Sequence, residues 1–258
     1  MTLLVENLSY HYDDGRNIFK NVTLQVSQGD ILVILGSNGV GKSTLLNCVA
    51  NHLTPQQGKV TIEGKNVRDM SAVELAQKAA YVAQFHNPIF AYSVRDVVLL
   101  GRSAYMNALK GPSHEDVEIS NHTMEQMGII HLAEKPYTNI SGGERQLVMF
   151  AQAIVQSPSY LILDEPTSHL DFGNQIKCLE IIENMAQNGF GVLMTSHFPD
   201  HSLMFDHNVA ILHNGRTIDC GSAANIITKG NMEKMYGIKV EINNQAFHRN
   251  VCIPMRDL

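Results

Sequence analysis

One stretch of the sequence combines glycines, a lysine and hydroxyl groups in a spacing that binds phosphate. Residues 36–44 read G-S-N-G-V-G-K-S-T, which fills the pattern G-x-x-x-x-G-K-[ST] between an apolar run and a helical run. Glycines let backbone N–H groups approach phosphate oxygens, Lys42 adds a positive charge, and the Ser43 hydroxyl suits Mg²⁺. We therefore expect the phosphates of a nucleotide here, contacted by Gly36, Ser37, Asn38, Gly39, Gly41, Lys42, Ser43 and Thr44.

A second stretch places two acids where they could act on that nucleotide. Residues 160–166 read Y-L-I-L-D-E-P, and the carboxyl end of such an apolar strand lies at the sheet edge where ligands bind. Asp164 is placed to hold Mg²⁺, and Glu165 is a candidate general base that polarises an attacking water. The alternative is a solvated acidic turn, which four apolar residues directly before two adjacent acids disfavour.

A glycine pair stands at the start of a third stretch, where a helix is expected. Residues 140–146 read I-S-G-G-E-R-Q, and Ser141 and Glu144 form the capping box S-x-x-E. The box accounts for a helix start, but it does not explain Gly142 and Gly143, which lower helix propensity. Because a capped helix end points N–H groups at an anion, this stretch is a second candidate for phosphate contact.

The surrounding sequence alternates short β-rich runs with helical runs, which predicts an α/β fold with a largely parallel sheet. We expect a helix over residues 42–53 and strands over residues 30–35, 59–62, 80–83, 160–163, 191–195 and 209–212. Residues 85–156 change to helical patterns, with further capping boxes at Ser93–Asp96 and Ser113–Asp116. Asn214-Gly215 predicts a hairpin turn before residues 216–220, and the last thirty residues have less pattern.

Composition narrows the classes of protein. The 258 residues are 44% hydrophobic and 17% charged, which is enough apolar sequence for a full core. A net charge of −6 disfavours nucleic acid as the main ligand. The apolar runs are far shorter than the ~20 residues of a membrane helix, and the N-terminus lacks the basic region of a signal peptide. Four scattered cysteines indicate a reducing compartment, so we expect a cytoplasmic protein that reaches a membrane only through a partner.

The order of the three motifs resembles that of the ATP-binding-cassette (ABC) ATPases, which carry a Walker A loop, an L-S-G-G-Q-type signature and a Walker B strand. Ile140 and Glu144 are mild departures from that signature. Shorter pieces resemble the Q-loop (81–84, Y-V-A-Q), the D-loop (168–171, S-H-L-D), the switch histidine (195–197, T-S-H) and the adenine-stacking A-loop (7–12, N-L-S-Y-H-Y). The resemblance spans residues 3 to about 222 and implies an ATPase that uses ATP and Mg²⁺.

The resemblance also implies an architecture. The fold would be α/β, a P-loop NTPase (RecA-like) core with a mostly parallel sheet, an antiparallel β subdomain and an inserted helical subdomain. Within one ABC domain, residues 1–84 and 157–230 would form the nucleotide-binding core. Residues 85–156 would form the helical signature subdomain, and residues 231–258 a C-terminal extension.

Individual roles follow from the resemblance. Gln84 would contact Mg²⁺ and the attacking water, and His197 would contact the γ-phosphate and Glu165. Tyr12 would stack on adenine, with Tyr10 the weaker choice and packing against a strand the alternative. The expected catalytic set is Glu165, His197, Gln84 and Lys42, and the expected metal set is Ser43, Gln84 and Asp164. Two subunits would pair head to tail, so that the partner's ATP or P-loop meets Ser141, Gly142, Gly143, Glu144 and Asp171.

Residues 85–102 resemble the helical entry of metal-chelate importers, which carry iron–siderophore, haem, cobalamin and some oxyanions. Pro88, Phe90 and a helix over residues 94–100 would shape a groove for a membrane subunit, with a packed helix of no partner specificity as the alternative. The implied protein is an importer ATPase on the cytoplasmic side of the cell membrane, with permease subunits and a substrate-binding protein as partners. A separate-subunit exporter, a non-transport ABC ATPase and a nucleotide switch are the alternatives. Glu165 and His197 disfavour the switch, because a protein that only binds ATP needs neither.

Overall fold

A six-stranded sheet forms the centre of the protein, a computed structural model that describes residues 1–84, 91–106, 111–243 and 250–255. Its strand order is β10-β9-β3-β8-β7-β6, and neighbours are parallel except for β9 and β10. Every residue of β3, β7 and β8 is buried, because both faces of the sheet are covered. The strands are β3 (Ile31–Leu35), β6 (Ala79–Val82), β7 (Tyr160–Leu163), β8 (Gly191–Ser196), β9 (Asn208–His213) and β10 (Arg216–Ser222).

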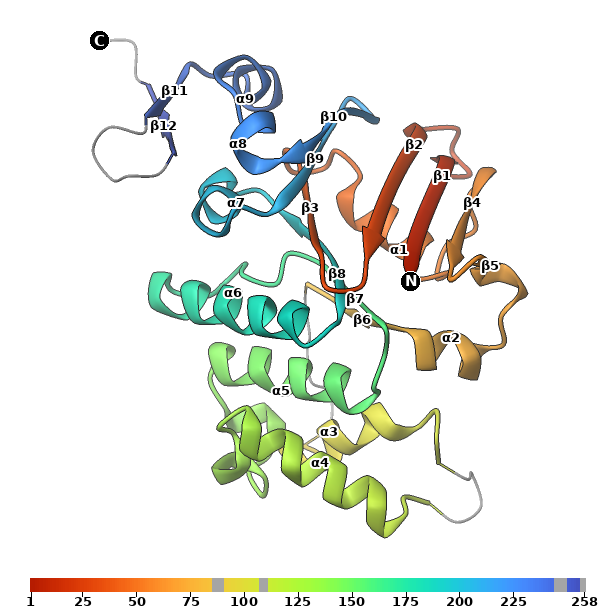
Figure 1. Cartoon of the computed structure of the whole chain (residues 1–258). Helices are drawn as coiled ribbons and strands as arrows, with labels where there is room; N and C mark the ends of the chain where they lie inside the picture. Colours follow the sequence, from red (N-terminus) through yellow and green to blue (C-terminus); the bar gives the residue numbers. More distant parts are fainter. Residues whose placement is uncertain (85–90, 107–110, 244–249, 256–258) are drawn as a thin grey trace.

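A smaller antiparallel sheet, in the order β2-β1-β4-β5, stands beside the larger one (Figure 1). Its strands are β1 (Thr2–His11), β2 (Asn17–Ser27), β4 (Gln57–Ile62) and β5 (Lys65–Asn66). Helix α1 (Lys42–Val49) shares one apolar cluster with this sheet and with Leu32 and Ile34 of β3. The predicted helix over residues 42–53 is too long, because Asn51 takes a left-handed φ of 60° just after the Ala50 cap. The predicted combination of parallel and antiparallel sheets is confirmed.

The opposite face of the central sheet packs against helices. Val33 of β3 and Leu161 of β7 share a second apolar cluster with Val148 of α5 (Gly142–Val155) and Leu179 of α6 (Phe172–Gln187). Alternate residues of one strand thus serve opposite clusters, as the period of two requires. The sheet is therefore held from both sides, and the loops at its strand ends have a rigid base.

Helices α3 (Val94–Leu99), α4 (His114–Gln126) and α5 form a group at one end of the molecule (Figure 1). The three predicted capping boxes, which begin at Ser93, Ser113 and Ser141, are all present with both of their hydrogen bonds. Pro88 and Phe90, expected to shape a groove nearby, lie outside the described residues. No helix in the described ranges is long and apolar enough to cross a membrane. The short helical elements are α2 (Ala72–Lys78) and 3₁₀ turns at Val67–Asp69, Leu100–Arg102, Ile130–Leu132 and Tyr137–Asn139.

A buried ion pair fastens this helical group together. The Arg102 guanidinium donates to Asp116 Oδ1 at 2.9 Å and to the carbonyl of Val155 at 2.9 Å. It also lies over the Tyr105 ring, 4.0 Å from its centroid. Asp116 is at the same time the capping-box acid of α4, where it accepts hydrogen bonds from Ser113. One carboxylate therefore both caps α4 and ties that helix to the end of α5.

The C-terminal part is more ordered than its weak sequence pattern predicted. It contains α7 (Pro199–Phe205), α8 (Ala223–Ile226), α9 (Lys229–Tyr236) and a hairpin of β11 (Val240–Asn243) and β12 (Val251–Pro254). The predicted turn before β10 is confirmed, with φ of 48° at Asn214 and 70° at Gly215. Met232, Met235, Val240 and Cys252 are buried in the cluster that covers the central sheet. Each of these C-terminal elements is short and has few apolar residues, so its sequence shows little hydrophobic periodicity. Several of those few apolar residues are nevertheless buried.

We predict that Asp116→Ala lowers the free energy of unfolding by about 3–5 kcal/mol, because it leaves the buried Arg102 without its carboxylate. Hydrogen bonds from Ser113, and then the Arg102 guanidinium, lower the pKa of Asp116 in the folded protein. The carboxylate therefore stabilises the fold above the unfolded pKa of about 4, and this contribution is lost as pH falls through the lower folded pKa. Urea unfolding at neutral and acidic pH measures both effects.

Asp96→Ala is the matched control, because Asp96 caps α3 in the same way but is exposed. Its loss should cost only about 1 kcal/mol, the usual value for a helix cap. Equal destabilisation by the two variants would show that the Arg102 pair adds nothing to the cap.

Candidate functional site

The predicted phosphate loop runs from the end of β3 into α1, and close packing requires glycine at two of its positions. Gly41 has φ of 107°, and a Cβ there would lie 2.5 Å from Cγ2 of Ile18. A Cβ at Gly36 would lie 2.7 Å from the carbonyl of Leu212. Because Gly41 is the N-cap of α1 and has no side chain, no side-chain cap occupies the first N–H groups of that helix. The loop therefore has the form of an anion site at a helix N-terminus.

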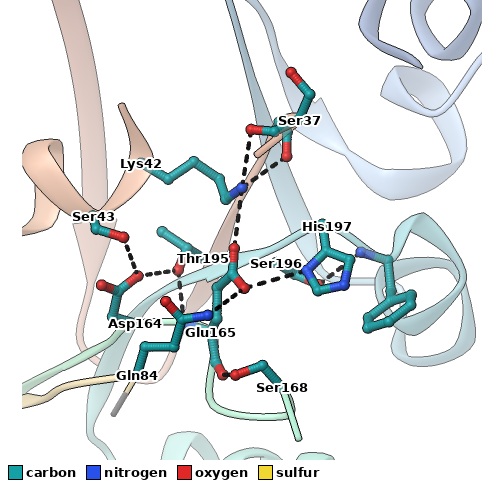
Figure 2. Close-up of polar contacts among 12 residues, drawn as sticks. Ser37, Lys42, Ser43, Gln84, Asp164, Glu165, Ser168, Thr195, Ser196 and His197 are labelled. Carbon is teal, nitrogen blue, oxygen red and sulfur yellow. Dashed lines mark hydrogen bonds and ion pairs between the residues drawn. The ribbon is translucent and has the colours of Figure 1, made fainter. Parts of the chain in front are cut away.

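The side chain of Lys42 turns back into this loop. Its ammonium group donates to the carbonyl of Gly36 at 2.8 Å and to that of Ser37 at 3.3 Å, and it lies 3.1 Å from Glu165 Oε1. Lys42 is only 4% exposed. The structure thus brings the predicted phosphate-binding cation and the predicted general base into direct contact, as Figure 2 shows.

The Asp164 carboxylate lies at the end of β7 and accepts hydrogen bonds from three hydroxyl groups. Ser43 donates to Oδ1 at 3.1 Å, Thr195 donates to the same oxygen at 2.8 Å, and the Tyr81 phenol donates to Oδ2 at 3.4 Å. Burial and the nearby Asp164 charge raise the pKa of Tyr81, so this phenol stays protonated and acts as a donor. The predicted pair of Ser43 and Asp164 therefore presents adjacent oxygen atoms, which are the ligands Mg²⁺ prefers.

Glu165 is the point at which the predicted catalytic residues meet. Its carboxylate contacts Lys42, accepts a hydrogen bond from Gln84 Nε2 at 3.0 Å and lies 3.3 Å from His197 Nδ1. The His197 contact has the distance of an ion pair but not the geometry of a hydrogen bond. Four residues from separate parts of the sequence therefore share one small volume (Figure 2).

The backbone of Glu165 is held in an uncommon conformation. Its φ is 46°, in the left-handed region that a residue with a side chain rarely adopts. The N–H donates to Thr195 Oγ1 at 2.8 Å, and the carbonyl accepts bonds from the N–H and hydroxyl of Ser168 at 3.0 and 2.8 Å. These bonds offset the strain and direct the carboxylate towards Lys42.

Tyr12 and Tyr10 occupy different environments. Tyr12 lines a cavity of about 400 Å³ together with the phosphate loop, Gln84 and Glu165, and its hydroxyl lies 3.2 Å from Thr44 Oγ1. Tyr10 is 8% exposed and stacks on Phe19 in the core. The preference for Tyr12 over Tyr10 as the base-stacking residue agrees with these positions, although stacking itself stays a prediction.

The signature residues lie apart from this cavity within one chain. Ser141, Gly143 and Glu144 line a separate cavity of about 420 Å³ against α6, and none of them lines the Lys42 cavity among the described residues. In the capping box, Ser141 N–H donates to Glu144 at 2.7 Å and lowers the pKa of that carboxyl. Ser141–Glu144 and Asp171 thus do not join the site of their own chain, and their expected contact with a partner's nucleotide stays a prediction.

The packing of the chain explains why position 143 is a glycine, which the sequence alone did not reveal. A Cβ there would lie 3.3 Å from Asn174 Nδ2, which is tight, whereas a Cβ at Gly142 would meet nothing within 4 Å. Asn174 in turn donates through its side chain and its backbone to Asp171, at 2.8 and 2.9 Å. Asn174, which is bonded to the D-loop residue Asp171, therefore lies close beside the start of the signature helix.

Two residues that hold the site were not predicted. Thr195 bonds both Asp164 and the N–H of Glu165, and Tyr81 bonds Asp164. Both stand inside pieces that resembled family motifs, next to Gln84 and His197. The available signal was a polar side chain at the end of a strand parallel to β7, which places it at the same sheet edge.

A glycine loop, a buried lysine, a hydroxyl–carboxylate oxygen pair and a second buried carboxylate at one sheet edge are typical of a protein that binds and hydrolyses a nucleoside triphosphate. The chain belongs to the ABC transporter family, whose model matches residues 19–168. It is therefore an ATPase that binds ATP.

Relatives and solved structures agree with this family. The molybdate import ATP-binding protein MolC of Haemophilus influenzae is 35% identical over 91% of this chain and 87% of its own length. The hemin import ATP-binding protein HmuV of Bordetella avium is 35% identical over 94% of each chain. A metal-chelate type ABC transporter solved in an inward-facing conformation aligns with a TM-score of 0.88, at 31% identity over 99% of this chain and 97% of that chain.

We predict that Thr195→Val lowers the rate of ATP hydrolysis about 10–100-fold and weakens activation by Mg²⁺. The hydroxyl orients Asp164 and Glu165 together, and loss of a partner that orients a metal ligand has effects of about this size. Valine keeps the volume and the β-branch, so the strand should persist. Steady-state ATPase assays over a range of Mg²⁺ concentration measure the effect.

Thr61→Val is the control, since Thr61 is also a buried strand threonine but lies in β4 of the other sheet. A Thr195→Val enzyme with the wild-type rate and Mg²⁺ dependence would contradict this role for the hydroxyl.

Proposed function

We propose that this ATPase powers a multi-subunit importer for a metal chelate or a related oxyanion. The observation that carries the ATPase part is the contact of Glu165 with Lys42, Gln84 and His197 beside the phosphate loop. The cargo class rests on two of the relatives, which are a molybdate import protein and a hemin import protein, and on the metal-chelate type transporter of the same fold.

In this proposal the residues divide the work of hydrolysis. Backbone N–H groups of the loop and the Lys42 ammonium bind the phosphates, and Tyr12 stacks on the adenine. Glu165 orients a water molecule and takes its proton. Gln84 and His197 hold the Glu165 carboxylate in line with the γ-phosphate. The closeness of these groups supports the assignment, because such catalysis depends mainly on positioning and on charge.

Ser43, Asp164 and Gln84 would hold Mg²⁺. The donor set fits, because a hydroxyl and a carboxylate oxygen already lie 3.1 Å apart, and Gln84 lines the same cavity as Ser43. When bound, Mg²⁺ would neutralise charge on the phosphates.

We further propose that two copies pair head to tail. Ser141, Gly142, Gly143 and Glu144 would then face the γ-phosphate held by the partner, and Asp171 its phosphate loop. Support comes from their position, because they lie outside the Lys42 cavity of their own chain and have a capped helix end available for an anion. The subdomain boundaries at residues 84–85, 156–157 and 230–231 stay part of this proposal.

Membrane permease subunits, and with them a substrate-binding protein, complete the proposed importer, which places this chain on the cytoplasmic side of the cell membrane. The direct test is to co-purify the chain with its permease, to reconstitute the complex in membrane vesicles and to measure transport of cargo into them. We expect ATP-dependent uptake of hemin, an iron(III)-hydroxamate or molybdate from the side of the binding protein. Transport in the opposite direction would favour a separate-subunit exporter, and ATPase activity with no permease partner would favour a non-transport ABC ATPase.

We predict that Glu165→Gln reduces ATP turnover at least about 100-fold and yields a dimer in the presence of ATP. The amide retains the shape of the side chain but cannot take the proton of water, so ATP stays intact between the two subunits. ATPase assays and light scattering with and without ATP provide the two readouts.

Glu125→Gln makes the same chemical change at an exposed position of α4 and should behave as the wild type. A Glu165→Gln variant that hydrolyses ATP normally would refute the role of Glu165. One that loses turnover but stays monomeric with ATP would refute the proposed dimer.

A further inference from the structure

The C-terminal part of the chain contacts the loop that carries His197. The phenol of Tyr236, the last residue of α9, donates a hydrogen bond to the backbone carbonyl of His197 at 2.5 Å. Thirty-nine residues separate the two in sequence. A residue outside the motifs and outside the ATP cavity is thus bonded directly to a proposed catalytic residue.

A second contact fastens the same loop from the hairpin. The N–H of Cys252 in β12 donates to Asp200 Oδ1 at 2.8 Å. Asp200 lies in the first turn of α7, three positions after His197. Tyr236 and Cys252 therefore hold the loop at both ends of its short span, one through α9 and the other through the hairpin.

The two contacts have a rigid base. Met232 and Met235 of α9, Val240 of β11 and Cys252 of β12 are buried in the same cluster as the central sheet. The Tyr236 ring packs against that cluster, and burial raises the pKa of its phenol, so the group keeps its proton and remains a donor. The C-terminal part is thereby joined to the strands that carry the site.

The geometry of His197 makes its carbonyl important. The carbonyl and the imidazole share one Cα, so fixing the peptide plane limits the directions in which the ring can point. The ring also lies 4.0 Å from the Phe198 ring, centroid to centroid, and its Nδ1 is 3.3 Å from Glu165 Oε2. Without the Tyr236 bond, the loop after β8 would lose one of the contacts that keep the imidazole beside Glu165.

We infer that Tyr236 is a positioning residue for ATP hydrolysis, through which helix α9 holds His197 in place to act with Glu165. The inference rests on the proposed role of His197. It assigns the C-terminal part of the chain a function in the chemical step, and none in binding ATP, because Tyr236 does not line the cavity of Lys42 and Tyr12.

Tyr236→Phe is the test, since it removes the hydroxyl and retains the ring that packs in the core. We expect kcat to fall about three- to tenfold, because small errors in the position of a catalytic group reduce the rate, while KM for ATP stays within about twofold. Tyr105→Phe is the control, because the Tyr105 hydroxyl also donates to a backbone carbonyl, that of Gln156 at 3.1 Å, but in the helical group. Its kcat should remain at the wild-type value.

A second pair of variants tests the other anchor without touching Tyr236. Asp200→Ala removes the acceptor of the Cys252 N–H and should lower kcat in the same way, again with KM unchanged. Asp200→Asn keeps a side-chain carbonyl that can accept that bond, and it should restore most of the rate. Thermal unfolding of each variant shows whether the fold is retained.

The outcomes separate this inference from the function on which it rests. Hydrolysis at the wild-type rate by His197→Ala would overturn the proposed role of His197 itself. If His197→Ala is inactive but Tyr236→Phe keeps the wild-type kcat, the site stands and the inference falls. A Tyr236→Phe variant that loses kcat, affinity for ATP and thermal stability together would also overturn it, because that pattern indicates general loss of structure.

Discussion

A buried ion pair between Lys42 and Glu165 joins the phosphate loop to the end of β7, and the rest of the site is arranged around it. Both side chains are at most 10% exposed, and charges at that depth are tolerated only when further hydrogen bonds surround them. The carbonyls of Gly36 and Ser37 accept from the ammonium group, and the Gln84 amide donates to the carboxylate. The segments that follow β3, β6 and β7 are therefore held together by this ion pair and the hydrogen bonds around it.

The same pair suggests a route by which a bound nucleotide would change the proposed site. A terminal phosphate in the loop is an anion that competes with Glu165 for the Lys42 ammonium. In the proposed mechanism the ammonium would turn to the phosphate, and Glu165, still beside Gln84 and His197, would be free to contact a water molecule. Binding of the triphosphate and release of Glu165 from Lys42 would then be two results of one exchange of partners.

Much of this arrangement could be predicted from the sequence, because the phosphate loop, the two acids and the capping boxes are contiguous motifs whose function is encoded locally. The site residues missed were Thr195 and Tyr81, which act on Asp164 only because β8 and β6 flank β7. The contact of Tyr236 with His197 depends on how α9 packs, and no local pattern encodes it. The early end of α1 at Val49 shows the same limit, since the apolar period continues after the backbone has turned.

Strand β8 has a special place because it lies between β3, which leads into the phosphate loop, and β7, which carries the acids. Its register pairs Thr195 with Ile34 of β3 and Met194 with Leu163 of β7. A slip of one residue would turn Thr195 to the opposite face of the sheet and would remove the hydroxyl from both Asp164 and Glu165. Because His197 follows directly after the last residue of β8, the register of β8 also sets the position of the His197 backbone and so of its imidazole. The relative positions of Asp164, Glu165 and His197 therefore depend on strand pairing in the buried sheet. The positions of the loops that follow these strands depend on the same pairing.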